Sequence, residues 1–201
     1  MKILHKNAQL LLALFFFFFL GRSAYSHPGH IGSGIVSGFL HPFEGLDHFL
    51  AALALGIFVS LSSNRFEFRL PLVFISLLFF GAIVGYFYTK IPGAEGGIIL
   101  SLFVLSFAIM LSQDMSKKIK FGFAALFGFF HGNAHGSEFV GSVFDFFNYI
   151  FAILLATAFL HMAGIFLVLA FKKYLSTSKT KTVVQVFGLA SFLISLSLLF
   201  S

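Results

Sequence analysis

The sequence has no cysteine and no tryptophan, and charged residues make up only 10% of its 201 residues. Without cysteine, the chain can form neither a disulfide framework nor a thiolate metal site. A soluble domain carries roughly 25% charged and about 45–50% apolar residues. Here 59% of the residues are hydrophobic and the mean hydropathy is +1.00. The shortage of charge therefore predicts an integral membrane protein.

Acidic residues are scarcer than basic ones, 7 against 13, which gives a formal charge of +6. A basic chain can bind nucleic acid, but these basic residues lie in short loops between apolar runs and form no patch with interleaved aromatics. We therefore expect no nucleic-acid partner. The phosphate-binding pattern G-x-x-x-x-G-K-[ST] is also absent from the sequence, so the chain is not itself a P-loop ATPase.

Residues 1–26 have the pattern of a secretory signal peptide. Lys2 and Lys6 precede an apolar core, Leu10 to Leu20, which is followed by Ala24-Tyr25-Ser26. The alternative is an uncleaved anchor, and both interpretations place the following residues on the same side of the membrane. Residues 27–201 then form one domain.

Six apolar segments follow, at approximately 31–61, 70–88, 94–112, 119–140, 145–171 and 182–200. We expect all six to be helices, because open strands cannot satisfy their backbone groups in lipid. The predicted fold is an all-α membrane protein, a bundle of six transmembrane helices. The first segment would be roughly 46 Å long against a hydrocarbon core of about 30 Å. We expect a break at Pro42, with a continuous span from Pro42 to Leu61 preceded by a short broken or re-entrant piece.

The loops predict the orientation. With the N-terminus outside, the outer side of the mature chain carries only Lys90, and the inner loops carry nine basic residues: Arg65, Arg69, Lys117, Lys118, Lys120, Lys172, Lys173, Lys179 and Lys181. This is a strong positive-inside bias. We expect a bacterial cytoplasmic (inner) membrane protein whose mature termini both face the periplasm or exterior.

Two segments place ionisable side chains inside apolar runs, where they are costly and by default mark a substrate or ion pathway. The second segment reads GFFHGNAHGSEFV, residues 128–140. On a helix, His131, His135 and Glu138 share one face, and Gly132 and Gly136 would let a neighbouring helix approach closely. Imidazole and carboxylate groups form a ligand set for a divalent transition metal. The alternative is a set of interhelical hydrogen bonds without metal.

The first segment reads GFLHPFEGLDHFL, residues 38–50. His41, Glu44 and His48 form one stripe if the helix continues through Pro42. Asp47 is turned about 100° from its neighbour His48, which suits a carboxylate that orients an imidazole by accepting its free N–H. Alternatively, Asp47 is a metal ligand and Glu44 lines the entrance.

Both motifs fall toward the outer half of the predicted bundle, so they can form one site. The similarity of Gly38-Phe39-Leu40-His41 to Gly128-Phe129-Phe130-His131 also suggests a 3+3 inverted repeat, as in many transporters with midplane sites. There are three weaker candidates. His161 in the fifth segment could be a second binding position for an ion or a hydrogen-bonded bundle histidine. His27 and His30 could capture metal outside.

At these motifs the sequence resembles the HupE/UreJ family of nickel and cobalt permeases. The pattern H-x5-D-H is matched by His41, Asp47 and His48, and F-H-G-x-A-H-G-x-E is matched in full by residues 130–138. The resemblance implies that six residues handle the metal: His41, Asp47, His48, His131, His135 and Glu138. One departure is Glu44, an extra carboxylate soon after Pro42, where family members often have a glycine.

These observations predict a permease, not an enzyme, that imports a divalent transition metal. The resemblance points to Ni²⁺ or Co²⁺ as transported substrate, with no separate cofactor, and to hydrogenase or urease maturation proteins as partners. Two alternatives stay open: a membrane accessory protein that delivers metal to a partner enzyme, and an intramembrane metal-dependent hydrolase. No H-E-x-x-H occurs in the sequence, which counts against the hydrolase.

Overall fold

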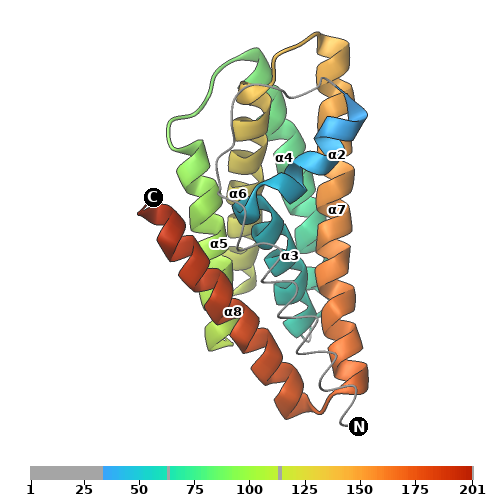
Figure 1. Ribbon diagram of the computed structural model, residues 1–201, viewed down its shortest axis with the longest axis vertical. Helices are drawn as coiled ribbons and strands as arrows, with labels where there is room; N and C mark the ends of the chain where they lie inside the picture. Colours follow the sequence, from blue (N-terminus) through green and yellow to red (C-terminus); the bar gives the residue numbers. More distant parts are fainter. Residues whose placement is uncertain (1–33, 63, 113–114, 201) are drawn as a thin grey trace.

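The computed structural model describes residues 34–62, 64–112 and 115–200 (Figure 1). Throughout these ranges the regular structure is helical, without strands, so the predicted all-α class is confirmed. The described ranges hold seven α-helices and one 3-10 helix, in this order: α2 (Ile35–Glu44), α3 (Leu46–Leu61), η1 (Arg65–Arg69), α4 (Leu70–Phe87), α5 (Ala94–Leu111), α6 (Lys117–Glu138), α7 (Val143–Tyr174) and α8 (Thr177–Leu199). The predicted signal segment, and with it His27 and His30, lies outside the described residues.

Four of these helices are long and apolar enough to cross a bilayer: η1 with α4, α5, α7 and α8. The pair α2 and α3 meets the same criterion only together, because each helix alone is too short, with 10 and 16 residues. The two helices are bent by 83° relative to each other. Helix α6 does not meet it, since its first four residues include three lysines and its last turns carry the polar second motif. The chain is thus a multi-pass membrane protein with four or five candidate spans among the described residues, and a count of six stays a prediction.

The surface of α7 carries a regular row of exposed phenylalanines. Phe144, Phe151, Phe159 and Phe166 recur at seven- or eight-residue spacing and are each more than half exposed. Residues at this spacing share one helix face. A continuous apolar face of this kind would be a liability in water, whereas in a bilayer it contacts lipid.

The break in the first segment falls at Gly45 and not at Pro42, which corrects the sequence-based expectation. Helix α2 continues through Pro42 to Glu44, and Gly45 then adopts an extended conformation (φ −87°, ψ 117°) before α3 begins at Leu46. Proline removes one helical N–H and disturbs the preceding turn, but a sharp bend between two helices needs a residue that leaves helical dihedral angles. The 83° bend places His41 and His48 on two different helices that meet at this corner.

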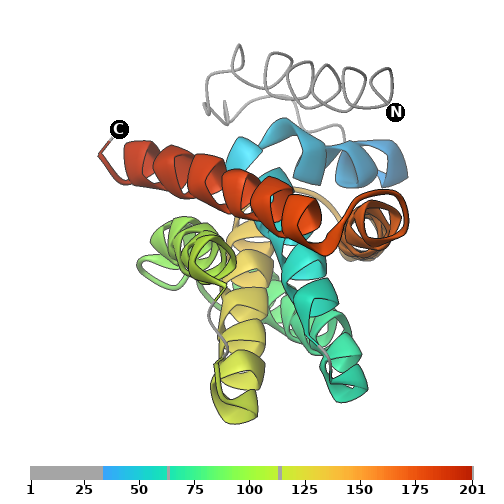
Figure 2. The same ribbon diagram turned by 90° about the horizontal axis from the view of Figure 1, so that it is seen from below.

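Helices α4 and α6 form the most extensive helix pair of the bundle and lie side by side (Figures 1 and 2). Their contact is backbone to backbone. A Cβ on Gly132 would lie 1.8 Å from the carbonyl oxygen of Leu78, and one on Gly136 would lie 2.1 Å from that of Ala82. The predicted close approach at these glycines is therefore confirmed, and the neighbouring helix is α4.

Helices α3, α5 and α7 end, and α4, α6 and α8 begin, at the same end of the bundle, as Figure 1 shows. We call it the basic end, because it carries nine basic residues: Arg65, Arg69, Lys117, Lys118, Lys120, Lys172, Lys173, Lys179 and Lys181. Lys90 lies between α4 and α5 at the opposite end, which we call the acidic end. The second motif forms the last turns of α6 and so lies toward the acidic end.

Candidate functional site

The two motifs meet through a pair of histidines. Nε2 of His41 on α2 lies 3.1 Å from Nδ1 of His135 on α6, within hydrogen-bonding distance. One of these nitrogens must donate and the other accept, so the rings have complementary tautomers. Their centroids are 4.8 Å apart and the planes are nearly perpendicular.

Four imidazoles make up one cluster, which we call the histidine cluster: His41, His48, His131 and His135. His48 packs against both histidines of α6, with ring centroids 5.4 Å from His131 and 4.8 Å from His135. The rings of His41 and His48 are 6.1 Å apart. His131 and His135 are almost completely buried. The predicted convergence of the two motifs is thus seen directly in the fold.

Asp47 orients His48. Its Oδ1 accepts hydrogen bonds from both the backbone N–H and the ring Nδ1 of His48, each 2.9 Å long. A carboxylate can only accept, so Nδ1 carries the proton and Nε2 carries the lone pair. This is the arrangement that metal-binding histidines commonly need from a neighbouring group. The two hydrogen bonds to His48 are the contacts expected of the orienting alternative for Asp47, and a role as metal ligand stays a prediction.

A hydrogen bond within α6 gives His131 the same tautomer as His48. Nδ1 of His131 donates to the carbonyl oxygen of Phe127, 2.8 Å away, which again leaves the lone pair on Nε2. The Nε2 atoms of His48 and His131 are both buried without a hydrogen-bond partner among the described residues. An unsatisfied buried polar atom costs roughly 1–3 kcal/mol, so two in one place call for an explanation.

Both unpartnered nitrogens belong to residues that line a small cavity of about 10 Å³. Its walls come from α2, α3, α4, α6 and α7, and they include Pro42, Phe74, His135 and Thr157. A volume of this order is about that of a single water-sized probe. The site can therefore take one small polar species between imidazole lone pairs. In the described chain, no three histidine or acidic side chains have their donor atoms already converged on one point.

The remaining acidic candidates lie at the rim, not in the histidine cluster. Glu138 is partly exposed and lies 3.5 Å from Nζ of Lys90, which also forms an ion pair with Glu95. The hydrogen bond to Glu95 raises the pKa of the Lys90 ammonium, so this lysine stays charged. Glu44 is 64% exposed, with its carboxylate 3.9 Å from Nδ1 of His41. The predicted stripe of His131, His135 and Glu138 is thus divided between the cluster and its rim.

His161 is buried on α7, on the side of the cluster that faces the basic end. Both of its ring nitrogens lack a hydrogen-bond partner among the described residues. The ring of Phe74 stands between it and the cluster, with its centroid 5.3 Å from His161 and 5.1 Å from His131. Within the described part of the chain, the interpretation of His161 as a hydrogen-bonded bundle histidine is therefore not supported.

Asn133, in the middle of the second motif, was not singled out from the sequence. It is fully buried, and its side chain accepts from the backbone N–H of Ile91 (2.7 Å) and donates to the carbonyl oxygen of Thr89 (3.0 Å). These bonds tie the loop that carries Lys90 to α6. The only available signal was an amide side chain between two histidines.

Comparison with known proteins supports a single family. The family model described as HupE / UreJ protein matches residues 14–198. Among curated proteins, Protein HupE of Rhizobium leguminosarum bv. viciae is 29% identical over 142 residues, which are 71% of this chain and 74% of the relative. No solved structure matches the chain.

Proposed function

Because the chain belongs to the HupE/UreJ family of membrane transporter and accessory proteins, which are not enzymes, we propose that it is a permease for a divalent transition metal. The metal is Ni²⁺ or Co²⁺, and it crosses the membrane through the histidine cluster. Family membership removes the intramembrane hydrolase from the alternatives.

The observation that carries this proposal is a pair of Nε2 lone pairs, on His48 and His131, which lie beside one small cavity and have no hydrogen-bond partner in the described part of the chain. Neutral imidazole is the commonest protein ligand for metals of this class. A cation at this place would interact with lone pairs that the fold otherwise leaves unsatisfied. The unfavourable free energy of burying these two nitrogens is then the consequence of a preformed metal site.

His135 completes the ligand set. Its ring contacts both His41 and His48, so a small rearrangement of these side chains can bring more than two nitrogens to one ion. Binding exchanges the hydrogen bond between His41 and His135 for bonds to the metal. Asp47 keeps His48 in the correct tautomer and makes its Nε2 a stronger ligand.

The rim favours the approach of a cation from the acidic end. Glu44, Glu95 and Glu138 are all at least partly exposed there. Lys90 neutralises part of this charge through its two ion pairs. The rim thus combines carboxylates that attract a divalent ion with one ammonium group that the ion must displace. Under the positive-inside rule this end faces the periplasm or exterior.

Beyond the cluster, the route continues past Phe74 to His161. The ring of Phe74 lies between His131 and His161, each of which has at least one ring nitrogen without a hydrogen-bond partner among the described residues. We read this ring as an apolar barrier between two binding positions. His161 is the second stop, and the ion leaves toward the basic end of the bundle, the predicted cytoplasmic face.

The membrane potential can supply the energy. A divalent cation moving inward gains about 2 × 2.3 kcal/mol per 100 mV. This corresponds to an accumulation on the order of a thousandfold. The absence of cysteine and the presence of only 4 methionines argue against Cu(I). Nickel and cobalt are chosen over zinc or manganese on the ground of the family.

The test is uptake of radiolabelled nickel by cells that lack their own importer, at matched membrane amounts of each variant. The variants are wild type, His48→Ala and, as control, Asp145→Asn, which removes a carboxylate at the acidic end away from the cluster. Saturable uptake in wild type and control but not in His48→Ala supports the permease.

The accessory-protein alternative has a distinct result in the same assay. It expects background uptake in all three strains, while purified wild-type protein still binds nickel and His48→Ala does not. Binding without flux would therefore overturn the permease and keep the cluster as a metal site. Partner proteins in hydrogenase or urease maturation would then receive the metal from this site directly.

A further inference from the structure

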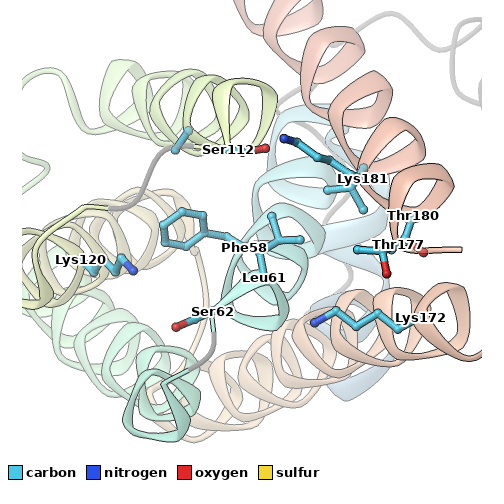
Figure 3. Close-up of a pocket in the computed structure, with 11 residues that line it drawn as sticks. Phe58, Leu61, Ser62, Ser112, Lys120, Lys172, Thr177, Thr180 and Lys181 are labelled. Atoms are coloured by element: carbon cyan, nitrogen blue, oxygen red, sulfur yellow. The ribbon is translucent and has the colours of Figure 1, made fainter.

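A second, larger cavity lies at the basic end, far from the histidine cluster along the bundle. Its volume is about 570 Å³, and it lies between α3, α5, α7 and α8, with Lys120 of α6 at one side (Figure 3). Cavities of roughly 300–1,000 Å³ are the usual size for small-ligand sites. The packing of α8 explains the space: this helix rests mainly on α5 and makes few contacts with α3 and α7.

The lining is divided by chemistry. Phe58, Leu61 and Val184 form an apolar wall, and three lysines direct their side chains toward the space, as Figure 3 shows: Lys120, Lys172 and Lys181. One of these charges is balanced, because Lys120 forms a buried ion pair with Glu67 at 2.8 Å.

The other two lysines have no carboxylate beside them among the described residues. Lys172 donates to the carbonyl oxygen of Ser60, 2.6 Å away, a hydrogen bond that leaves its positive charge in place. Thr177 begins α8 at the same cavity, so the positive end of the helix dipole adds to the field. Within the described ranges, the other acidic residues belong to the acidic end: Glu44, Asp47, Glu95, Glu138 and Asp145.

We propose that this cavity binds the phosphate group of an anionic phospholipid from the adjoining leaflet, with Lys172 and Lys181 holding the phosphate. The wall of Phe58, Leu61 and Val184 then covers the first carbons of the acyl chains. Basic pockets between membrane helices on the cytoplasmic side are a recurrent form of lipid headgroup site. A soluble phosphate offers the same charge but no partner for the apolar wall, so the lining favours the lipid. This assignment is independent of metal transport.

The test is lipid binding by the purified, delipidated full chain in detergent. Phosphatidylglycerol is titrated against phosphatidylcholine, and bound lipid is counted by native mass spectrometry. We expect wild type to prefer phosphatidylglycerol, and the double variant Lys172→Gln/Lys181→Gln to bind it on the order of tenfold more weakly or worse. The variant Lys172→Arg/Lys181→Arg keeps both charges and should retain binding, which separates the loss of charge from a folding defect.

The chain offers a matched control. Lys173→Gln/Lys179→Gln removes two charges from the same two helices at the same end, but neither residue lines the cavity. An equal loss of lipid in this control, or no preference for phosphatidylglycerol in wild type, would overturn the proposal. Full displacement of the lipid by equimolar glycerol 3-phosphate would assign the site to a soluble phosphate and overturn the lipid assignment.

Discussion

His41 Nε2 and His135 Nδ1 lie 3.1 Å apart, so two motifs separated by 94 positions in the chain share one hydrogen bond. The bond joins α2 to α6 near the bend at which α3 begins. Neither motif alone offers more than two histidines. Together they form one cluster of four imidazoles, which requires both segments to be in place.

His135→Ala tests the centre of the cluster. This ring contacts His41 and His48 and donates or accepts the only hydrogen bond between the motifs in the described chain. We expect nickel uptake to fall to background while the protein remains inserted in the membrane. Uptake and membrane abundance are measured on the same cells, with Ser137→Ala on the same helix as control. Wild-type flux in His135→Ala would remove the second motif from the mechanism.

Asp47→Asn tests the orientation of His48. The amide keeps the shape of the carboxylate but can present N–H to the ring, which disturbs the tautomer that leaves Nε2 free. Changes of this kind cost roughly 10–100-fold in metal affinity. We expect the half-saturating nickel concentration to rise by that factor with little change in protein level. An unchanged half-saturating concentration would show that the carboxylate does not act through His48.

Glu44→Gln tests the extra carboxylate of the first motif. Glu44 is exposed and 3.9 Å from His41, so it meets the ion before the cluster does. We expect the order of competition among nickel, cobalt and zinc to change more than the maximal uptake. The measurement is uptake of labelled nickel against each unlabelled competitor. Identical competition curves in wild type and variant would refute a role in metal preference.

Gly132→Ala tests the contact between α4 and α6. The added Cβ would lie 1.8 Å from the carbonyl oxygen of Leu78, so the helices must separate. Overpacking of this type costs about 1–3 kcal/mol, and we expect a lower unfolding temperature in detergent. Gly122→Ala on the same helix is the control, since nothing lies within 4 Å of its Cβ position. Equal unfolding temperatures for the two variants would contradict the close backbone contact.

Phe74→Ala tests the barrier between the cluster and His161. The ring contacts both His131 and His161, so the substitution removes the aromatic group between them. We expect severalfold faster efflux of nickel from preloaded proteoliposomes, whereas Phe74→Leu should stay close to wild type. Because Phe→Ala in a core costs roughly 3–5 kcal/mol, rates are compared per folded protein. Efflux from Phe74→Ala at the wild-type rate would show that the ring is not a barrier.

Much of this arrangement follows from the sequence, because it depends on local chemistry. Apolar runs of membrane length predict helices, and the spacing of His131 and His135 places them on one face of α6. The role of Asp47 toward His48 also depends only on neighbours in the chain. In each case the interaction lies within one helix or one turn.

The features that the sequence did not predict depend on contacts between distant segments. The bend falls at Gly45 because that residue leaves helical dihedral angles, whereas Pro42 stays in the helix. Glu138 turns to Lys90 instead of the histidines because the loop before α5 comes close to the end of α6. Asn133 holds that loop through backbone atoms, which no residue pattern indicates.

The backbone contact between α4 and α6 has a consequence for how the site can open. Two helices whose glycines press on each other's carbonyl oxygens, as at Gly132 and Gly136, cannot slide or rotate separately without a clash. We therefore expect them to move together as one rigid arm, whose boundary with the helices of the first motif has no such backbone contact in the described chain. The histidine cluster straddles that boundary, with His41 and His48 on one side and His131 and His135 on the other. Under the proposed function, a single shift of this arm would separate the histidines of the first motif from those of the second, which would release a bound ion without any change within either pair.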